Sequence, residues 1–544
     1  MKNKLNLLIV ALFLLIQTTL AQTWTQIGQD IDGEAEGDLS GSSVSLSSDG
    51  NTVAIGAPWN IGNADDAGHV RVYQNVNGSW TQIGSDIDGE AEGDWSGHSV
   101  SLSSDGKTVA IGAPGTSNTD DTGHVRVYQN VNGSWTQIGS DIDGEASRDF
   151  FGYSVSLSSD GSIVAIGEHG QSISAGHVSV YQNVNGSWTQ IGSDIDGVVG
   201  SEVPPGGSVS LSSDGKTVAI GEPYNVVNGY DSGHVRVYQN VNGSWTQIGS
   251  DIDGEVDNWR GRFNSVSLSS DGNIVAIGTP GNDGNGTDAG HVKVYKNING
   301  SWTQIGSDID GEAYDESGWS VSLSSDGKTV AIGARNNGGN DYASGHVKVY
   351  KNINGSWTQI GSGIDGEAEY DHSGASVSLS SDGNIVAIGA PGNGGNGNLA
   401  GHVSVYKNIN GSWIQIGSDI DGEAWGDRSG ASVSLSSDGN IVAIGAPENN
   451  GNGDWTGHVR IYKLETGANT ETIEAHNIYI SPNPVSDILT VNGISQPVEF
   501  QITDLTGKEI LSGEISNNSV DVSTLKVGIY LLKLENRSIQ FVKE

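Results

Sequence analysis

The chain has 544 residues, of which 81 are glycine and none is cysteine, and its 65 acidic and 25 basic side chains give a formal net charge of −40. Without cysteine the fold has no disulfides and no thiolate ligands for a zinc site. Binding to nucleic acid requires clustered lysine and arginine, so this acidic chain excludes nucleic acid as a partner and attracts cations instead.

The first 21 residues are predicted to be a secretory signal peptide. A basic start at Lys2 and Lys4 precedes the apolar run from Leu5 to Ile16, and Ala21 supplies a small residue for cleavage. The apolar run is shorter than the roughly 20 residues that span a bilayer, which favours a cleaved signal over a membrane anchor. No later segment is long and apolar enough, so we expect a mature chain without a transmembrane segment.

Residues 22–463 repeat a unit of about 55 residues, a period that is typical of repeat folds. The unit reads Ser-Val-Ser-Leu-Ser-Ser-Asp-Gly, Val-Ala-Ile-Gly, Gly-His-Val-Arg-Val-Tyr, Asn-Gly-Ser and Trp-Thr-Gln-Ile. Apolar residues alternate with polar ones in each short run, and Asn-Gly predicts a tight hairpin, so each unit is expected to form four antiparallel strands. The turn aspartate is present in eight copies: Asp49, Asp105, Asp160, Asp214, Asp271, Asp326, Asp382 and Asp438.

Radial repetition of four-stranded sheets makes a β-propeller, and a linear solenoid is the alternative. The strand Trp24–Gly28 precedes the first complete unit, while the last unit ends at His458–Lys463 without its tryptophan strand. Pairing these two segments would close a ring and remove both exposed edges. We therefore predict an all-β fold, an eight-bladed propeller of four-stranded blades closed by an N-terminal strand. Seven blades with one atypical unit is the alternative count.

The motif Ser-Gly-x-Ser-Val-Ser-Leu-Ser-Ser-Asp-Gly, the aromatic-glycine start Phe151-Gly152 and the Ala57-Pro58 ending resemble the FG-GAP repeat. This repeat forms the blades of integrin α-subunit propellers and of many bacterial surface proteins, and the resemblance covers about residues 23–463. Blades of that family often hold Ca²⁺ in an Asp/Asn-rich loop between the first two strands. Only a short Ser-Ser-Asp-Gly turn stands there in this chain, so that site is not carried over.

Residues 464–476 break the period and are predicted to be a polar linker, and residues 477–544 are predicted to form a separate small β-sandwich. This last segment resembles the C-terminal sorting domain of type IX secretion cargo in Bacteroidetes. The resemblance implies contact with the type IX secretion machinery, and then either attachment at the cell surface or release. The residues that carry it are Pro482, Asn483, Pro484, Gly528, Tyr530 and Lys543.

An acidic group, Asp-Ile-Asp-Gly-Glu-Ala-Glu-Gly-Asp in its first copy, follows each tryptophan strand. Carboxylates that alternate around a glycine suit Ca²⁺, which takes about six to eight oxygen ligands. Ca²⁺ is the one cofactor that the sequence suggests, and the alternative is a solvated connection that uses Asp and Gly for turn conformations. The candidate ligands in the first two copies are Asp30, Asp32, Glu34, Asp38, Asp86, Asp88, Glu90 and Asp94.

Repeated residues are expected to maintain the scaffold, because an enzyme needs one asymmetric constellation. The tryptophan is interpreted as an anchor between blades. The histidine of each Gly-His pair is interpreted as an imidazole that bonds a neighbouring turn at a strand edge. These histidines are His69, His124, His177, His234, His291, His346, His402 and His458.

Ligand binding is expected where the copies diverge, since loops on a rigid scaffold carry variation and function. An acid/base group at Glu168, His169 and Glu222 is one interpretation, and solvated loop residues are the other. No nucleophile elbow, phosphate loop or His-Glu-x-x-His motif is present. The candidate ligand-binding loop residues are Glu168, His169, Glu222, Trp259, Arg260 and Arg335.

The favoured hypothesis is a secreted, cell-surface or released propeller that binds a protein or glycan partner without catalysis. One alternative is an extracellular polysaccharide-degrading enzyme, a lyase or hydrolase, with its site on the divergent loops of repeats three to five. The other is a structural display or spacer module, which the near-identical copies favour. Binding on a glycan array would indicate the binding protein, and release of product from a polysaccharide would indicate the enzyme. A negative result in both assays would favour the spacer module.

Overall fold

A computed structural model describes residues 22–115, 122–147, 149–168, 177–197, 207–222, 226–227, 230–231, 233–254, 265–338, 342–465, 479–481, 483–492, 498–504, 508–515, 518–534 and 537–544. These residues form strands, turns and loops, with no helix among them. The chain divides into two compact units between Gly467 and Ala468. The predicted signal peptide and residues 466–476 of the predicted linker lie outside the described residues.

The first unit is built from eight sheets, and the first two strands of each sheet are Ser-Val-Ser-Leu and the buried Val-Ala-Ile-Gly run. In chain order the first strands are β3 (Ser43–Leu46), β8 (Ser99–Leu102), β13 (Ser154–Leu157), β18 (Ser208–Leu211), β25 (Ser265–Leu268), β30 (Ser320–Leu323), β35 (Ser376–Leu379) and β40 (Ser432–Leu435). The second strands are β4 (Thr52–Ala57), β9 (Thr108–Ala113), β14 (Ile163–Gly167), β19 (Thr217–Glu222), β26 (Ile274–Thr279), β31 (Thr329–Ala334), β36 (Ile385–Ala390) and β41 (Ile441–Ala446).

The third strand begins at the Gly-His pair and turns through Asn-Gly into the tryptophan strand. Asn77 and Gly78 have φ of 55° and 84°, the positive values that a tight hairpin of this kind requires. The third strands are β5 (His69–Val76), β10 (His124–Val131), β15 (His177–Val184), β22 (His234–Val241), β27 (His291–Ile298), β32 (His346–Ile353), β37 (His402–Ile409) and β42 (His458–Glu465). The fourth strands are β6 (Ser79–Gln82), β11 (Ser134–Gln137), β16 (Ser187–Gln190), β23 (Ser244–Gln247), β28 (Ser301–Gln304), β33 (Ser356–Gln359), β38 (Ser412–Gln415) and β1 (Thr23–Gln26).

The Ile-Asp pair of the acidic group is a short continuation of the fourth strand rather than a free connection. It pairs with the start of the third strand, as Ile87 with Val70 and Asp88 with His69 in blade one. The acidic side chains therefore lie beside the Gly-His pair of their own blade. These short strands are β7 (Ile87–Asp88), β12 (Ile142–Asp143), β17 (Ile195–Asp196), β24 (Ile252–Asp253), β29 (Ile309–Asp310), β34 (Ile364–Asp365), β39 (Ile420–Asp421) and β2 (Ile31–Asp32), and blade four adds a hairpin of β20 (Val226–Val227) and β21 (Tyr230–Asp231).

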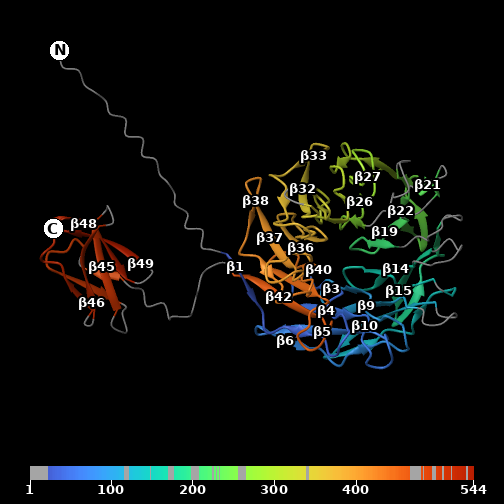
Figure 1. Ribbon diagram of the computed structural model, residues 1–544, viewed down its shortest axis with the longest axis horizontal. Helices are drawn as coiled ribbons and strands as arrows, with labels where there is room; N and C mark the ends of the chain where they lie inside the picture. Colours follow the sequence, from blue (N-terminus) through green and yellow to red (C-terminus); the bar gives the residue numbers. More distant parts are fainter. Residues whose placement is uncertain are drawn as a thin grey trace, which may run out of the picture. The chain divides into compact units, whose positions relative to one another are not determined.

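The sheets are arranged around a common centre, and β1 lies beside β42 although they come from opposite ends of the repeat region (Figure 1). Thr23 pairs with Glu465 and Gln26 with Tyr462, so the eighth blade is β40–β41–β42–β1. The predicted eight-bladed propeller with its N-terminal closing strand is confirmed. Strand β42 extends to Glu465, two residues beyond the predicted start of the linker.

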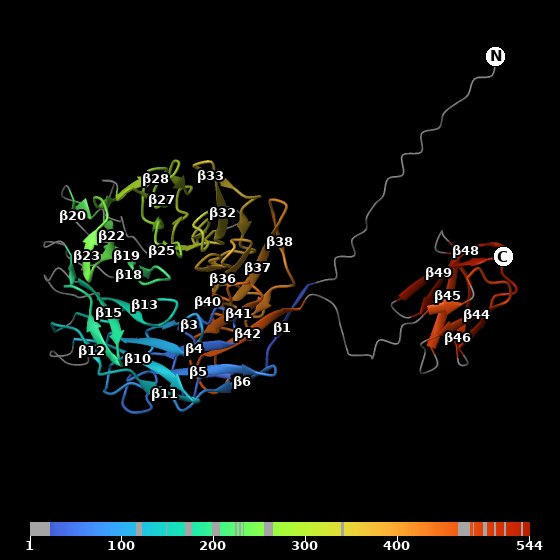
Figure 2. The same cartoon turned by 180° about the vertical axis from the view of Figure 1, so that it is seen from behind.

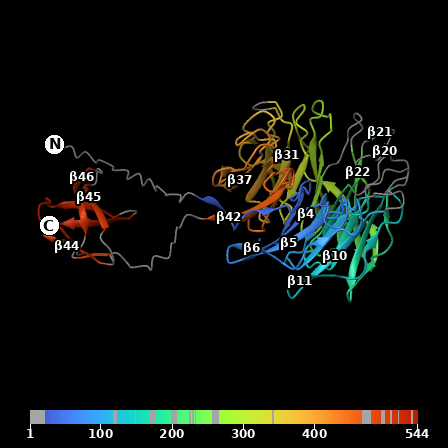
Figure 3. The ribbon, with the colours of Figure 1, turned by 60° about the horizontal axis from the view of Figure 1, so that its bottom comes forward.

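The first strands lie near the centre of the ring and the fourth strands at its rim (Figure 2), and neighbouring blades stand side by side (Figure 3). A closed circle of backbone hydrogen bonds joins all eight blades at the second serine after each first strand. In each bond the N–H of one serine donates to the carbonyl oxygen of the next, at N···O distances of 2.9–3.0 Å. The circle runs through Ser48, Ser104, Ser159, Ser213, Ser270, Ser325, Ser381 and Ser437, and returns to Ser48.

The apolar core of the propeller is eight clusters, each shared by two neighbouring blades. In the cluster between blades one and two, Val70 and Ile87 of the first blade pack with Val109 of the second, and Trp135 closes the outer end. The tryptophan of every blade occupies this place, which confirms its interpretation as an anchor between blades.

The second unit is a small β-sandwich, as predicted. One sheet has the order β43 (Tyr479–Ser481), β44 (Ile488–Asn492) and β47 (Ser519–Asp521), and the other has the order β46 (Glu509–Ile515), β45 (Val498–Asp504), β48 (Gly528–Leu534) and β49 (Arg537–Lys543). A single apolar cluster, which includes Leu489, Ile502 and Phe541, lies between the two sheets.

Candidate functional site

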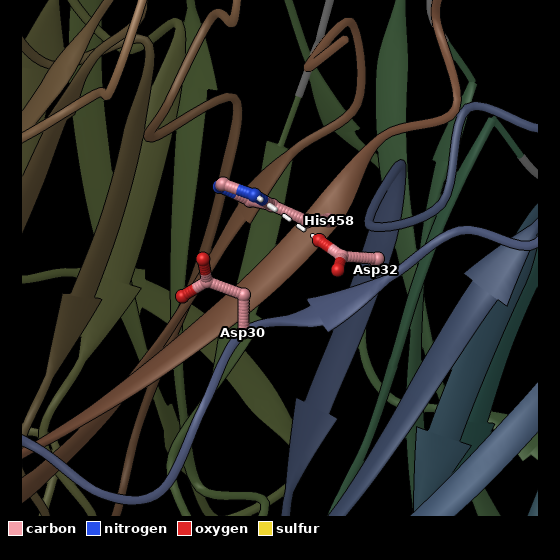
Figure 4. Close-up of side chains that lie close together, drawn as sticks. All are labelled: Asp30, Asp32 and His458. Carbon is pink, nitrogen blue, oxygen red and sulfur yellow. Dashed lines mark ion pairs between the residues drawn. The ribbon is translucent and has the colours of Figure 1, made fainter. Parts of the chain in front are cut away.

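The acidic group of the N-terminal segment meets the histidine of the last repeat at the seam of the ring. Asp30, Asp32 and His458 each offer a ligand atom, and these atoms lie within 4.8 Å of one another (Figure 4). An ion-pair contact joins His458 Nδ1 to Asp32 Oδ1 at 3.9 Å. Glu423 of blade seven approaches the same nitrogen to 3.9 Å. The seam thus gathers one imidazole and three carboxylates.

The His458 ring is buried, and neither of its nitrogens has a hydrogen-bond partner among the described residues. Burial and the nearby Arg460 charge lower the pKa of His458 to about 4, so the ring is neutral at physiological pH. Both nitrogens of His69 also lack a partner in the described part of the chain. The prediction that each imidazole bonds a neighbouring turn is therefore wrong for His69 and His458.

The same pairing of two aspartates with the histidine recurs among the described residues in blades four and five, as His234, Asp251 and Asp253 and as His291, Asp308 and Asp310, and a related group with a glutamate stands beside the seam at His69. Glu34 and Asp86 lie with His69 in this related group, whose ligand atoms are within 4.8 Å of one another. Burial, followed by repulsion from Asp86, raises the pKa of Glu34, and burial with repulsion from Asp30 raises the pKa of Asp32. Raised values mark carboxylates whose negative charge is incompletely compensated.

The remaining predicted calcium ligands have other partners. Asp38 Oδ2 accepts hydrogen bonds from the backbone N–H groups of Glu34 and Ala35, and its Oδ1 accepts one from Asn60 Nδ2. Asp94 Oδ2 holds the equivalent loop of the next blade through the N–H groups of Glu90 and Ala91. In that blade Arg126 lies 3.5 Å from Glu90 and donates to the carbonyl oxygen of Asp88. The structure thus brings together only subsets of the eight residues, and calcium binding stays a prediction.

Glu222, one of the predicted loop residues, is buried in blade four and pairs with the strand beside it. Its carboxylate lies 2.9 Å from His234 Nε2 and accepts hydrogen bonds from the Arg236 guanidinium. In blade one the corresponding Arg71 pairs instead with Glu34 of the preceding loop, at 3.7 Å. The loop before blade four carries Val198 at that position. Glu222 therefore replaces a missing carboxylate, which is a structural role.

Glu168 is the equivalent residue of blade three, and it is also buried. His177 Nδ1 lies 3.3 Å from Glu168 Oε1, and Phe151 packs near the imidazole at a ring-centroid distance of 6.0 Å. The acid/base group proposed with His169 stays a prediction, because His169 lies outside the described residues. Trp259 and Arg260 lie outside them as well.

A cleft of about 510 Å³, which we call the tyrosine cleft, opens among the loops of blades five to seven. Tyr314, Tyr342 and Tyr370 present their rings there with 63%, 68% and 50% of their surface exposed. The rings of Tyr342 and Tyr370 meet edge to face at 5.3 Å. Polar side chains surround the rings, and the lining is completed by Asp288, Glu316, Asn336, Ala343 and His372.

Hydrogen bonds between successive loops hold the tyrosine cleft in shape. The N–H of Tyr314 donates to Thr287 in blade five, and the N–H of Tyr370 donates to Tyr342 in blade six, at 2.7 and 3.0 Å. Arg335, a predicted loop residue, stacks on Trp319 at 3.0 Å and donates to Glu316 at 3.0 Å. Arg335 therefore supports the wall of the cleft.

The motif residues of the C-terminal unit lie together at one edge of its larger sheet. Asn483 Oδ1 accepts a hydrogen bond from the N–H of Val542 at 2.8 Å, and Gly528 pairs with Lys543. The Tyr530 hydroxyl donates to the Lys526 carbonyl oxygen at 3.0 Å. Pro484 follows Asn483 in this described segment, whereas Pro482 lies outside the described residues.

The fold and motifs define a repeat β-propeller with an appended sorting domain. Residues 477–544 match the family model of the secretion system C-terminal sorting domain, and residues 307–350 match that of the FG-GAP repeat. Both resemblances are confirmed. The sorting domain indicates that the protein is secreted and attached at the cell surface. In the described part of the chain, no helix has the length and apolar character to cross a membrane.

Comparison with curated proteins finds no match. Among solved structures the chain is similar to Sqt1 of Saccharomyces cerevisiae, with 13% identity and a TM-score of 0.47 over 82% of this chain and 99% of the other. It is also similar to the periplasmic gluconolactonase of Pseudomonas aeruginosa, with 17% identity and a TM-score of 0.39 over 64% and 97%. Such distant similarities carry no argument about function, and the propeller is established by its own strand pairing.

Proposed function

We propose that this protein is a secreted surface protein whose propeller binds a neutral glycan, free or on a protein partner, in the tyrosine cleft and performs no catalysis. The observation that carries the proposal is the cluster of three exposed tyrosines among polar side chains. The signal peptide and the sorting domain would deliver this surface to the outside of the cell, either attached or released.

The chemistry of the tyrosine cleft suits a sugar ring. Aromatic faces offer flat apolar area at low entropic cost, and carboxylate, amide and imidazole groups beside them can bond hydroxyl groups. Glu316 is paired with Arg335, whereas Asp288 adds negative charge to a cleft in a strongly acidic chain. Sulfated and uronic-acid glycans would therefore be repelled, and neutral glycans would be preferred.

The buried state of Glu168 and Glu222 argues against the alternative of an enzyme on repeats three and four. Both carboxylates pair with residues of the adjacent strand and are closed to a polysaccharide. A general acid or base must reach the proton that it transfers.

The proposal is tested on an array of neutral and anionic glycans with the mature full-length chain. We expect binding to neutral glycans, and the variants Tyr314→Ala and Tyr370→Ala should each weaken it by about 2 kcal/mol, or about 30-fold. The control is Trp455→Ala, since Trp455 is 60% exposed on a loop of blade eight outside the cleft. Binding that survives both tyrosine variants, or no binding, would contradict the proposal, and released product would indicate an enzyme.

A further inference from the structure

We propose that Asp30, Asp32 and His458 form a divalent transition-metal site that clamps the N-terminal closing strand to the last repeat. This inference goes beyond glycan binding and is independent of the tyrosine cleft. It also differs from an all-oxygen calcium site, because one ligand is an imidazole nitrogen.

The three ligand atoms lie near enough to one another to converge on one ion after a modest movement of their side chains. Ligands held at about 2.1 Å from a tetrahedral metal stand about 3.4 Å apart. His458 Nδ1 and Asp32 Oδ1 are 3.9 Å apart, and no pair in the group exceeds 4.8 Å. Carboxylate movements of about 1 Å, within the reach of a side-chain rotation, would therefore complete the site.

The buried imidazole is the observation that separates this group from an ordinary acidic surface. His458 is 1% exposed, and neither ring nitrogen has a hydrogen-bond partner in the described part of the chain. A buried polar atom without a partner is costly, and a metal bond to Nδ1 would remove that cost. The Nδ1 atom faces the Asp32 carboxylate across the gap in Figure 4.

The local charge also fits a divalent ion. Arg460 lies 3.9 Å from Glu423 and Arg71 lies 3.7 Å from Glu34. Asp30 accepts a hydrogen bond from the uncharged Gln26 Nε2, at 2.6 Å. The carboxyl groups of Asp30, Asp32, Glu34 and Glu423 thus outnumber the two guanidinium groups at the seam, and a divalent cation would relieve the repulsion among them.

The donor set and its access narrow the choice of ion. One neutral imidazole with carboxylates suits Zn²⁺ or Mn²⁺ better than Ca²⁺, which selects oxygen ligands. Asp30 and Asp32 line an open cleft of about 460 Å³ between blades eight and one, which gives the ion a path from solvent. Because Asp30 and Asp32 belong to the closing segment and His458 to β42, a bound ion would hold both ends of the ring.

Blade six provides a matched control within the same chain. Its His346 begins β32 as His458 begins β42, but Gly363 stands where the first aspartate of the pair stands in blade eight. A metal-dependent effect at the seam should therefore be absent from β32, β33 and β34.

The test is amide hydrogen exchange of the full-length chain in chelator and in Zn²⁺ or Mn²⁺ at about ten times the dissociation constant. We expect exchange of residues 23–32 and 458–465 to slow by about tenfold, with no change in blade six and a smaller effect of Ca²⁺. The variants Asp30→Asn and His458→Asn should lose the slowing. Asp30 precedes β2 and is half-buried, so in chelator Asp30→Asn should melt no lower than the wild type because a repulsive charge is removed.

Absence of slowing at the seam in saturating Zn²⁺ and Mn²⁺ would overturn the proposal. Slowing that persists in both variants, or that is equal in blade six, would overturn it too. Co²⁺ supplies a second measurement, since its visible absorption reports nitrogen ligation, and the seam contribution should disappear in His458→Asn.

Discussion

The backbone N–H of Ser437 donates to the carbonyl oxygen of Ser48 at 2.9 Å, which joins the last repeat to the first. The equivalent bond links each of the other seven pairs of neighbouring blades. The interface between blades eight and one therefore has the same backbone hydrogen bond as the other seven interfaces. A stack with open ends would leave one donor and one acceptor of this circle without their partners. The hydrogen-bonded circle is therefore complete only when the ring is closed.

Trp24 should contribute as much to the stability of this ring as a core side chain. It packs into the cluster between blades seven and eight, and its indole N–H donates to the Ile416 carbonyl oxygen at 2.7 Å. We expect Trp24→Ala to lower the free energy of unfolding by about 3 kcal/mol in urea denaturation. Trp425→Ala, at an exposed tryptophan, should stay within about 0.5 kcal/mol of the wild type. Equal effects of the two variants would show that the closing strand is not anchored.

Much of this fold was predictable because the same strand and turn motifs recur in eight copies along the sequence. The alternation of apolar and polar residues and the Asn-Gly pair predict the four strands of each blade. The unpaired strands at Trp24 and His458 then predict that the ring closes, as their pairing confirms. The place of the acidic group was not predictable, because the chain leaves the third strand after Gln26 and pairs with it again at Ile31 and Asp32. Local sequence does not show that pairing.

Glu222 should be structural and not catalytic. Removing it leaves the buried Arg236 and His234 without their carboxylate, so Glu222→Ala should cost about 3–5 kcal/mol in urea denaturation. The double variant Glu222→Ala/Arg236→Ala should recover part of this loss. The control is Glu34→Ala, which removes the half-exposed partner of Arg71 and should cost about 1 kcal/mol or less. A Glu222 variant as stable as the wild type would refute the compensation.

Acid should destabilise the protein through the eight Ser-Ser-Asp-Gly turns. At Asp49 burial acts to raise the pKa, but hydrogen bonds from Ser47 and Asn51 outweigh it and hold the pKa below its ordinary value of 3.8. Because the unfolded chain then binds protons more readily, stability that is present above the unfolded pKa is lost as the pH falls through the folded pKa. The same direction holds for Asp105, Asp160, Asp214, Asp271, Asp326, Asp382 and Asp438.

The carboxylates at the blade interfaces act in the opposite direction. Burial with repulsion from neighbouring acids raises the pKa of Asp32, Glu34, Asp88 and Glu423. As the pH falls from 7, protonation of these groups removes electrostatic repulsion in the folded state and so increases its stability. Melting temperature in chelator should therefore rise slightly from pH 7 to about pH 5 and fall steeply below about pH 4. A melting temperature that keeps rising down to pH 3 would contradict this balance.

Asp38 and Asp30 should respond differently to substitution, although both belong to one acidic motif. Asp38 is buried and accepts three hydrogen bonds, so Asp38→Ala should cost about 2–4 kcal/mol with or without metal. Asp30→Asn should cost little in chelator and should remove the metal response of the seam. Thermal melting of both variants with chelator, Ca²⁺ and Zn²⁺ separates the two roles. The assignment fails if Asp38→Ala melts like the wild type in chelator.

The tyrosine cleft shows why binding residues were harder to find than blades. The divergent residues of repeats three to five drew attention, but Glu168 and Glu222 turned out to be buried and paired. Tyr314 and Tyr370 precede the aspartate of the acidic group, where three other copies have glycine (Gly37, Gly93 and Gly426), and the change in one copy does not by itself indicate a binding residue. Their meeting with Tyr342 depends on hydrogen bonds between loops of neighbouring blades, which the sequence does not show.

Closure of the ring is tested most directly by a disulfide, since the chain has no cysteine of its own. Thr25 and Lys463 are exposed register partners on β1 and β42, and paired residues of an antiparallel ladder lie about 4.5–5.5 Å apart, within disulfide range. Oxidation of Thr25→Cys/Lys463→Cys should give an intrachain disulfide and a higher melting temperature, while Thr25→Cys/Lys407→Cys, directed at blade seven, should not. Disulfide-linked dimers alone, or equal crosslinking in both variants, would contradict the closed eight-bladed ring.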